Sequence, residues 1–320
     1  MNVMPRIPRM TGPACRVGRA LWRGAPASGG PSGGERSIPE EVAVALTYDF
    51  SSHAVMMATP LDLEDFAVGF SLSEGIVTAA EQIEDIEIVP GALGIDLRIS
   101  LAKPQREGFA RRRRRLAGPT GCGLCGVENL MQAMRPIRRV TREGRVSPQA
   151  IIDAVAALPA HQRLHGETRA VHAAALWRRG GGFLAVREDV GRHNALDKLA
   201  GALARAGRSA GDGAGIVVLT SRVSVEMVQK TAIMGAPIIV AVSAPTALAV
   251  RCCDAAGITL VAIARDDSFE VFSHAERIVP QADAAAAAGL NGFRTRSGAA
   301  RSAGVAATRR ARRSSAMRVP

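Results

Sequence analysis

The second half of the chain alternates short apolar runs with amphipathic stretches, and this alternation constrains the fold more than any other feature of the sequence. The pattern reads strand, helix, strand, helix, strand over residues 216–219, 225–234, 238–242, 246–255 and 258–264. A helix that connects two strands forms a crossover unit, and successive crossover units build a largely parallel sheet. We therefore expect a layered α/β arrangement in which ligands bind beyond the carboxyl ends of the strands, at residues 220–224, 243–246 and 265–268.

The preceding part of the chain mixes strands and helices. Strand patterns occupy residues 41–48, 86–89, 95–101, 170–177 and 182–187. We expect one helix to begin after Asp62 and a second to begin at Ser147 and Pro148 and to continue to residue 158. A third helix is expected over residues 193–206. We expect a smaller mixed α/β part over residues 39–146, which ends in a glycine-rich cysteine loop and a helix from about Glu128, and an α/β part over 147–283.

Both ends of the chain carry an excess of positive charge. The formal net charge is +12, and residues 1–38 contain six Arg against one Glu, while residues 284–320 contain eight Arg and no acid. These segments are rich in Ala, Gly, Ser and Arg, a composition that buries too little apolar surface to offset the entropy of the chain. We expect residues 1–38 to be a disordered basic extension and residues 284–320 to be a disordered Ala/Arg-rich tail.

Charge and composition also bear on the partners of the chain. A basic run at residues 111–115, together with Arg106, could attract a phosphate-bearing ligand or form a solvated loop. With one Tyr and two Trp the chain has few aromatic platforms for bases, and it has no helix-turn-helix or zinc-finger pattern, so we expect no nucleic-acid partner. No segment reaches about 18 consecutive apolar residues, and the N-terminus lacks the apolar region of a secretory signal, so we expect a cytoplasmic protein without a membrane association.

Two cysteines lie three residues apart in the sequence GCGLCG, which spans residues 121–126. A structural zinc site would need two further ligands, and Cys252 and Cys253 are adjacent, which makes it hard for both to reach one ion. A zinc deaminase or a thioredoxin-like site would need flanking residues that this chain lacks. A glycine-rich loop before a helix N-terminus instead favours a reactive thiolate at Cys122 or Cys125, which suits a sulfur carrier, although a dithiol oxidoreductase remains an alternative.

Two other stretches combine polar residues with a strand end. REDVGRHNALDK, residues 187–198, has two interpretations: a turn with a helix cap at Asn194 and surface positions at Asp197 and Lys198, or a site in which Arg192 and His193 face a ligand. ARDDS, residues 264–268, offers arginine for phosphate and carboxylates for the N–H donors of guanine, or forms a solvated turn.

Taken together, the segments resemble the FdhD family, the sulfur carriers that formate dehydrogenases need for their molybdenum cofactor. The resemblance rests on TPLDLEDFAVGFSLSEGIV (59–77), GCGLCG (121–126), REDVGRHNALDK (187–198), VSVEMVQK (223–230), SAPTALAV (243–250) and the Ser-His-x-Glu-Arg-Ile motif that ends at Ile278. It covers about residues 41–278. It implies a fold similar to that of cytidine deaminases without their zinc site, and a homodimer.

The resemblance also implies an activity, that of a sulfurtransferase. Such a protein takes persulfide sulfur from a cysteine desulfurase and passes it to the bis-molybdopterin guanine dinucleotide form of the molybdenum cofactor, which formate dehydrogenase then needs. By position, Cys122 would carry the persulfide and Cys125 would assist. Residues 147–283 would be the cofactor-binding part, with a binding segment formed by Ile263, Ala264, Arg265, Asp266, Asp267 and Ser268. A cofactor chaperone without sulfur chemistry is the other alternative, and no metal ligand is expected.

The chain departs from the family pattern at two loops. It has Thr168-Arg169-Ala170-Val171-His172 where the family generally has Thr-Gly-Gly-x-His, and residues 220–224 are one glycine shorter than the usual Thr-Ser-Gly-Arg-Val-Ser. Glycine permits unusual backbone angles and the close approach of a ligand, so both changes could alter cofactor binding.

Overall fold

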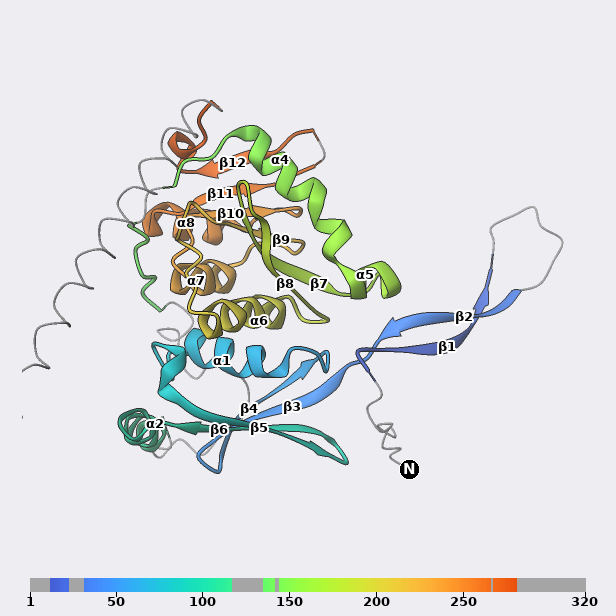
Figure 1. Ribbon diagram of the computed structural model, residues 1–320, viewed down its shortest axis with the longest axis vertical. Helices are drawn as coiled ribbons and strands as arrows, with labels where there is room; N and C mark the ends of the chain where they lie inside the picture. The colour runs from blue at the N-terminus through green and yellow to red at the C-terminus, as the bar shows by residue number, and fades with distance from the viewer. Residues whose placement is uncertain (1–11, 23–31, 117–134, 142–143, 266, 281–320) are drawn as a thin grey trace, which may run out of the picture.

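The computed structural model describes residues 12–22, 32–116, 135–141, 144–265 and 267–280, with only the backbone for 111–116. Within these residues the chain forms three sheets, of six, four and two strands (Figure 1). The four-stranded sheet is formed by strands within residues 42–101, and the six-stranded sheet by strands within residues 172–273. The α/β fold class is thereby confirmed.

The six-stranded sheet has the order β12-β11-β10-β9-β7-β8. Its strands are β7 (His172–Arg178), β8 (Gly182–Asp189), β9 (Ile216–Leu219), β10 (Ile238–Ala241), β11 (Thr259–Ala262) and β12 (Glu270–Ser273). The central strands β9, β10 and β11 are parallel, as the alternating pattern predicts, whereas β7, β8 and β12 are antiparallel to their neighbours. β9, β10 and β11 are buried along their whole length because helices cover both faces.

Two helical layers cover this sheet. One face packs against α6 (Arg192–Arg205), α7 (Val225–Ile233) and α8 (Ala247–Ala256), and the other against α4 (Pro148–Ala157). α4 begins as predicted, because the Ser147 side chain accepts a hydrogen bond from the backbone N–H of Ala150 and Pro148 occupies the first turn. Three short helices complete this part, namely η2 (Leu158–His161), α5 (Arg163–Thr168) and η3 (Ala275–Arg277).

The four-stranded sheet has the order β4-β3-β6-β5. It consists of β3 (Val42–Tyr48), β4 (Ser51–Ala58), β5 (Ile83–Gly91) and β6 (Gly94–Leu101), with η1 (Ala80–Gln82) before β5. Alternate residues of β3 and β6 are buried, and this apolar face packs against α1 (Leu63–Ser73). Asp62 precedes α1 as predicted, but it has a φ of 52° and its side chain makes no capping hydrogen bond.

Helices α1 and α6 join the two parts, and α6 lies between the six-stranded sheet and α1 (Figure 1). They approach closely because each contributes a glycine to the contact. A Cβ atom added to Gly69 would lie 1.7 Å from the backbone oxygen of Asp197, and one added to Gly201 would lie 1.9 Å from that of Asp65. The small residues are therefore required by the helix contact, which fixes one part against the other.

The expectation of disorder over residues 1–38 is wrong for the segments that the structure describes. Residues Ala14–Leu21 and Ser32–Pro39 form β1 and β2, an antiparallel hairpin that projects from the body (Figure 1). At its base, Ser37 Oγ donates to Glu167 and Arg36 donates to the backbone oxygen of Thr168 in α5. Backbone pairing and these contacts order the hairpin although its composition offers little apolar surface to bury.

The basic run at residues 111–115 belongs to a helix, α2 (Lys103–Leu116), and not to a loop. Arg106, which lies near this run in the sequence, is engaged within the protein. Its Nε lies 3.0 Å from Asp49 Oδ1, and its Nη2 donates to the backbone oxygen of Leu101. The predicted helix from Glu128 and the predicted tail over 284–320 lie outside the described residues.

Candidate functional site

Three loops meet at the carboxyl end of the parallel strands, as the alternating pattern predicts. The backbone N–H of Val223 donates to the oxygen of Ala244 at 3.3 Å, and the N–H of Thr246 donates back to the oxygen of Val223 at 2.9 Å. The N–H of Ile263 in turn donates to the oxygen of Ser243 at 3.3 Å. These bonds join the segments that follow β9, β10 and β11 into one continuous surface.

The segment after β11 has an unusual backbone conformation. Ile263 has a φ of 53°, a region that a β-branched residue rarely adopts, and the following Ala264 is buried against the α4 side of the sheet. Arg265 donates from Nη1 to the backbone oxygen of Val242 at 2.6 Å, while Asp267 and Ser268 are exposed. Strained backbone of this kind often lies at binding sites. Asp266 lies outside the described residues.

The groups at this edge fit an anionic nucleotide. Arg222 and Arg265 are exposed cations, and Asp267 is an exposed carboxylate that could accept hydrogen bonds from guanine. The N-termini of α7 and α8 lie at the same edge, where their free N–H groups favour phosphate. The Thr246 hydroxyl accepts from the N–H of Ala249 and so already caps α8. The guanine dinucleotide cofactor implied by the resemblance is thus compatible with the residues present.

The interpretation of Asp197 and Lys198 as surface residues is wrong, because both are at most 1% exposed. Lys198 Nζ lies 2.6 Å from Asp189 Oδ2 and donates to the backbone oxygen of Thr59 at 2.9 Å. Asn194 does not cap α6 but donates to Asp189 Oδ1 and to the backbone oxygen of Met57. Asp189, Asn194 and Lys198 therefore connect the segment that precedes α1 to the six-stranded sheet and its helices.

A second buried group links α1, α6 and α7. Asp197 accepts hydrogen bonds from Ser73 Oγ at 2.6 Å and from Lys230 Nζ. Burial raises the pKa of Asp197, and the Lys230 ammonium and the Ser73 hydroxyl oppose this rise. The sequence pattern does not reveal this group, because α6 is covered on two sides, by the sheet and by α1, so its polar positions do not mark a solvent face. A signal for this group was present in the sequence, because Asp197 and Lys198 are the polar residues within the apolar stretch 195–204 of α6.

The histidines of the motif region lie close to cations. Burial, together with Lys230 and Arg192, lowers the pKa of His193 to about 4. Burial and the neighbouring Arg192 also lower the pKa of His172. Both rings are therefore neutral at pH 7, which suits a hydrogen-bonding or proton-accepting role better than a charged one.

The predicted sulfur-carrying residues Cys122 and Cys125 lie outside the described residues, within the segment 117–134. Arg135, which follows this segment in the sequence, is held against the end of α1. Arg135 Nη2 donates to Glu74 Oε2 at 2.7 Å, and Nη1 donates to the backbone oxygen of Ser73 at 3.4 Å. Arg135 thus lies next to the buried group of Ser73, Asp197 and Lys230.

The remaining cysteines lie in other parts of the fold. Cys253 is buried in α8, and this burial raises the pKa of its thiol, so it is a poor nucleophile. Cys15 and Cys252 are partly exposed, and all three are free thiols. Among the residues that the structure describes, no three His, Cys, Asp or Glu side chains gather closely enough to hold a metal ion.

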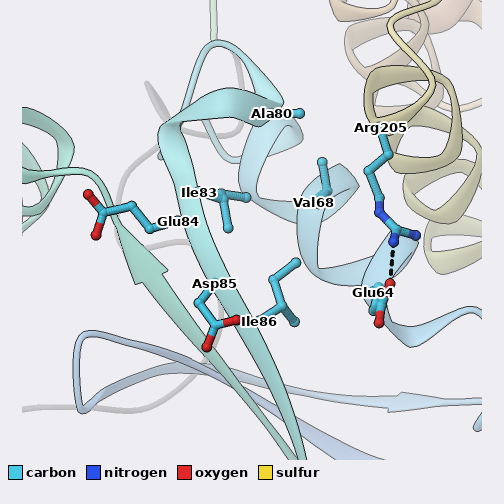
Figure 2. Close-up of a pocket in the computed structure, with 8 residues that line it drawn as sticks. All are labelled: Glu64, Val68, Ala80, Ile83, Glu84, Asp85, Ile86 and Arg205. Atoms are coloured by element: carbon cyan, nitrogen blue, oxygen red, sulfur yellow. Dashed lines mark hydrogen bonds and ion pairs between the residues drawn. The ribbon is translucent and has the colours of Figure 1, made fainter.

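A cavity of about 300 Å³ lies between α1, β5 and the end of α6 (Figure 2). Glu64, Glu84 and Asp85 line it, and the cation among its lining residues, Arg205, pairs with Glu64 and with Asp65. An excess of carboxylates would repel phosphates. This cavity is therefore not suited to the anionic cofactor, in contrast to the carboxyl edge of the six-stranded sheet.

Comparison with known proteins identifies the family to which a chain with this fold and these sequence motifs belongs. The FdhD/NarQ family model matches residues 39–279, and the chain belongs to this family. The match covers both large sheets and the α1–α6 contact between them, and it includes Cys122 and Cys125.

Curated relatives are similar over most of their length. The chain is 53% identical to the sulfur carrier protein FdhD of Agrobacterium fabrum over 265 residues, which cover 82% of this chain and 96% of the relative. It is 51% identical to the protein of the same name from Cupriavidus necator over 248 residues, which cover 78% of this chain and 85% of the relative.

A solved structure shares the fold. It comes from Desulfotalea psychrophila and is described as a formate dehydrogenase accessory protein; the TM-score is 0.65 at 25% identity, covering 83% of this chain and 99% of that one. In the part of the present chain that the structure describes, no helix is long and apolar enough to cross a membrane.

The two departures from the family pattern have structural consequences. Arg169 has a φ of 61° at the end of α5, so a non-glycine residue occupies a left-handed position where the resemblance led us to expect glycine. The shorter loop after β9 is closed by the backbone bonds of Val223 to Ala244 and Thr246, with Ser221 buried beneath it. The loop is thus complete without the extra glycine, and Arg222 remains exposed.

Proposed function

We propose that this protein is a sulfurtransferase of the carrier type, which takes persulfide sulfur from a cysteine desulfurase and passes it to the bis-molybdopterin guanine dinucleotide cofactor that formate dehydrogenase needs. The observation that carries the proposal is the 53% identity to a sulfur carrier protein over 96% of that relative's length. The family match also includes the GCGLCG segment. By the same relationship we propose a homodimer that acts in the cytoplasm.

The first step is a thiol exchange. The Cys122 thiolate attacks the outer sulfur of the donor persulfide, the S–S bond of the donor breaks, and the donor cysteine leaves as a thiolate. Cys122 then holds a persulfide, and no external oxidant or reductant is needed, because one S–S bond replaces another.

In the second step Cys125 assists release. Its thiolate attacks Cys122 Sγ, which forms a Cys122–Cys125 disulfide and releases hydrosulfide toward the acceptor; the two thiols supply the two electrons, and a dithiol reductant restores them. Arg222, Arg265 and Asp267 at the carboxyl edge would hold the cofactor through its phosphates and guanine. When bound, the cofactor supplies the molybdenum that receives the sulfur.

The test is intact-protein mass spectrometry after incubation with a cysteine desulfurase and cysteine. We expect a gain of about 32 Da in the wild type and in a Cys252→Ala control, reversed by dithiothreitol and absent from Cys122→Ala. A Cys122→Ala protein that still activates formate dehydrogenase would favour a cofactor chaperone instead. A readily cycled Cys122–Cys125 disulfide without any sulfur gain would favour a dithiol oxidoreductase.

A further inference from the structure

The hairpin of β1 and β2 meets the rest of its own chain at its base. Among the described residues, the side chains that join it to the body by hydrogen bonds are those of Arg36 and Ser37, which contact α5. Beyond this base the hairpin extends away from the body, and the eight residues of β1 span about 26 Å (Figure 1). A two-stranded hairpin that packs on nothing is only marginally stable in water, so a contact with another molecule would stabilise its outer part.

The outer end of the hairpin combines an apolar side chain with a cation. Trp22, which directly follows β1, is 71% exposed. Arg19 is exposed and forms no ion pair with the residues that the structure describes, whereas Arg16 pairs with Glu35 of β2. Trp and Arg are among the residues that most often dominate the binding free energy of protein interfaces. The hairpin therefore presents side chains that suit contact with a protein.

The body of the molecule has an apolar hollow of about 240 Å³ where α1, α6 and α7 end. Its apolar lining includes Leu72, Leu203, Ile233 and Met234, and Ile233 is 38% exposed. The acidic cavity shown in Figure 2 adjoins this apolar hollow, because Ala80 lines both. A large apolar side chain can therefore bind in one hollow while its neighbours in sequence reach the other.

The charge of the two hollows favours a basic partner. Their lining contains four carboxylates and two guanidinium groups, namely those of Glu64, Glu81, Glu84, Asp85, Arg205 and Arg208. The Glu64 side chain pairs with Arg205, and Glu84 lies 3.7 Å from Arg106. Glu81 and Asp85 are exposed and form no ion pair within the part of the chain that the structure describes. Their carboxylates are thus available to cations of another molecule.

The hairpin of a second copy matches both hollows. Arg19 precedes Trp22 by three residues, which is about 10 Å along an extended chain, so a cation and an apolar group follow one another on the hairpin. Free carboxylates and an apolar hollow likewise lie side by side on the body. Because the hairpin extends away from its own body, two copies related by a two-fold axis can exchange hairpins, which fills the hollows of both and closes the assembly at two chains.

We infer that each copy in a homodimer binds the hairpin of the other, with Trp22 in the apolar hollow and Arg19 paired with Glu81 of the partner subunit. The inference rests on the proposed homodimer and assigns its contact surface. Binding removes the apolar surface of Trp22 and Ile233 from water, and the Arg19 guanidinium compensates the negative charge beside the hollow.

The test is the dissociation constant of the dimer of the full-length protein, measured by analytical ultracentrifugation. We expect Trp22→Asp in the hairpin and Ile233→Asp in the hollow each to raise this constant by about tenfold or more. Val271→Asp is the matched control, since Val271 on β12 is 37% exposed and lines neither hollow, and it should leave the constant unchanged. Circular dichroism checks that each variant is folded.

A charge exchange tests the pairing of the two copies directly. Arg19→Glu and Glu81→Arg should each raise the dissociation constant by about threefold or more, because each places like charges opposite one another. The double variant Arg19→Glu, Glu81→Arg restores an opposite pair in both halves of the dimer, so its dissociation constant should return toward the wild-type value.

Each other outcome contradicts the inference in a recognisable way. Unchanged dissociation constants for both Trp22→Asp and Ile233→Asp would overturn the inference and leave the homodimer standing. A dimer weakened by Trp22→Asp alone would place the hairpin on another surface of the partner and would also overturn it. A wild-type protein that sediments as a monomer would refute the proposed homodimer itself, so the two failures are distinguished.

Discussion

At the scale of single residues, the buried ion pair of Lys198 and Asp189 is the interaction whose loss should reduce the free energy of unfolding most. Burial lowers the pKa of Lys198, and the Asp189 carboxylate opposes this shift. The pair is fully enclosed, so removal of one partner leaves an uncompensated charge. We expect Lys198→Met to reduce the free energy of unfolding by about 3–5 kcal/mol in urea titrations.

The control for this prediction removes both charges. In the double variant Asp189→Asn, Lys198→Met, the asparagine can still bond to the N–H groups of Thr59 or Gly191, which contact Asp189 in the wild type. Most of the lost stability should then return. A single Lys198→Met variant that loses less than about 1 kcal/mol would contradict the role assigned to the pair.

Also at this scale, His193 makes stability depend on pH. Its pKa is lowered to about 4 in the folded protein, against an ordinary value of 6.5. Between these values the unfolded chain binds a proton that the folded chain does not, so stability falls as pH falls from about 6.5 to 4, by about 2–3 kcal/mol. His193→Gln should flatten the stability profile in this window, and His172, whose pKa is also lowered, should leave a smaller residual slope.

The measurement is the urea midpoint at several pH values between 4 and 7. Equal slopes for the wild type and His193→Gln would show that carboxylates alone determine the acid response. Above pH 7 the two proteins should have the same dependence on pH, because His193 is neutral in both the folded and the unfolded state there.

At the scale of elements, the contact between α1 and α6 depends on glycine. A Cβ atom at position 201 would lie 1.9 Å from the backbone oxygen of Asp65, and helical backbone cannot yield locally as a flexible side chain can. Gly201→Ala must separate the two helices, which should cost about 3 kcal/mol by thermal or urea unfolding. In contrast, Gly166→Ala in α5 meets nothing within 4 Å and should stabilise the protein by about 0.5–1 kcal/mol.

The elements also show what the sequence could and could not predict. The alternation over 216–264 predicted β9, α7, β10, α8 and β11, because each apolar run is buried by helices on both faces. The same logic failed for the hairpin of β1 and β2, whose order comes from backbone pairing and not from apolar burial. It also failed for Lys198, because two partners compensate its burial, Asp189 at the end of β8 and Thr59 from a distant segment.

The candidate site was predictable only in part, because contacts between distant segments and unusual backbone angles have no local sequence pattern. The loops at the carboxyl edge follow from the order of strands and helices, so residues 220–224, 243–246 and 265–268 were expected together and are joined by backbone bonds. The φ of 53° at Ile263 carries no sequence signal, since isoleucine is typical of a regular strand. The anchor of Arg135 on α1 depends on two segments that are about sixty residues apart in the chain, and no local pattern encodes it.

At the scale of the whole molecule, the two parts satisfy each other's polar groups. Arg187 and Arg205 of the second part bind Asp65 of α1, and Asp197 binds Ser73. If the four-stranded sheet and α1 unfolded alone, these groups would lose their partners, and the apolar face of α6 that α1 covers would meet water. Independent stability of either part is therefore not expected, although each has its own core.

We therefore predict that the two parts unfold in one cooperative transition. Trp22→Phe leaves Trp177 as the sole tryptophan, and its fluorescence then reports the six-stranded sheet, because Trp177 is buried there in β7. Amide hydrogen exchange in β3 and β6 reports the four-stranded sheet. Both probes should give the same free energy of unfolding, and Gly201→Ala should lower both together, since it strains the contact that couples them. Exchange of the β3 and β6 amides at a free energy about 2 kcal/mol below the fluorescence value would show that the first part opens independently and that the α1–α6 contact does not couple the two.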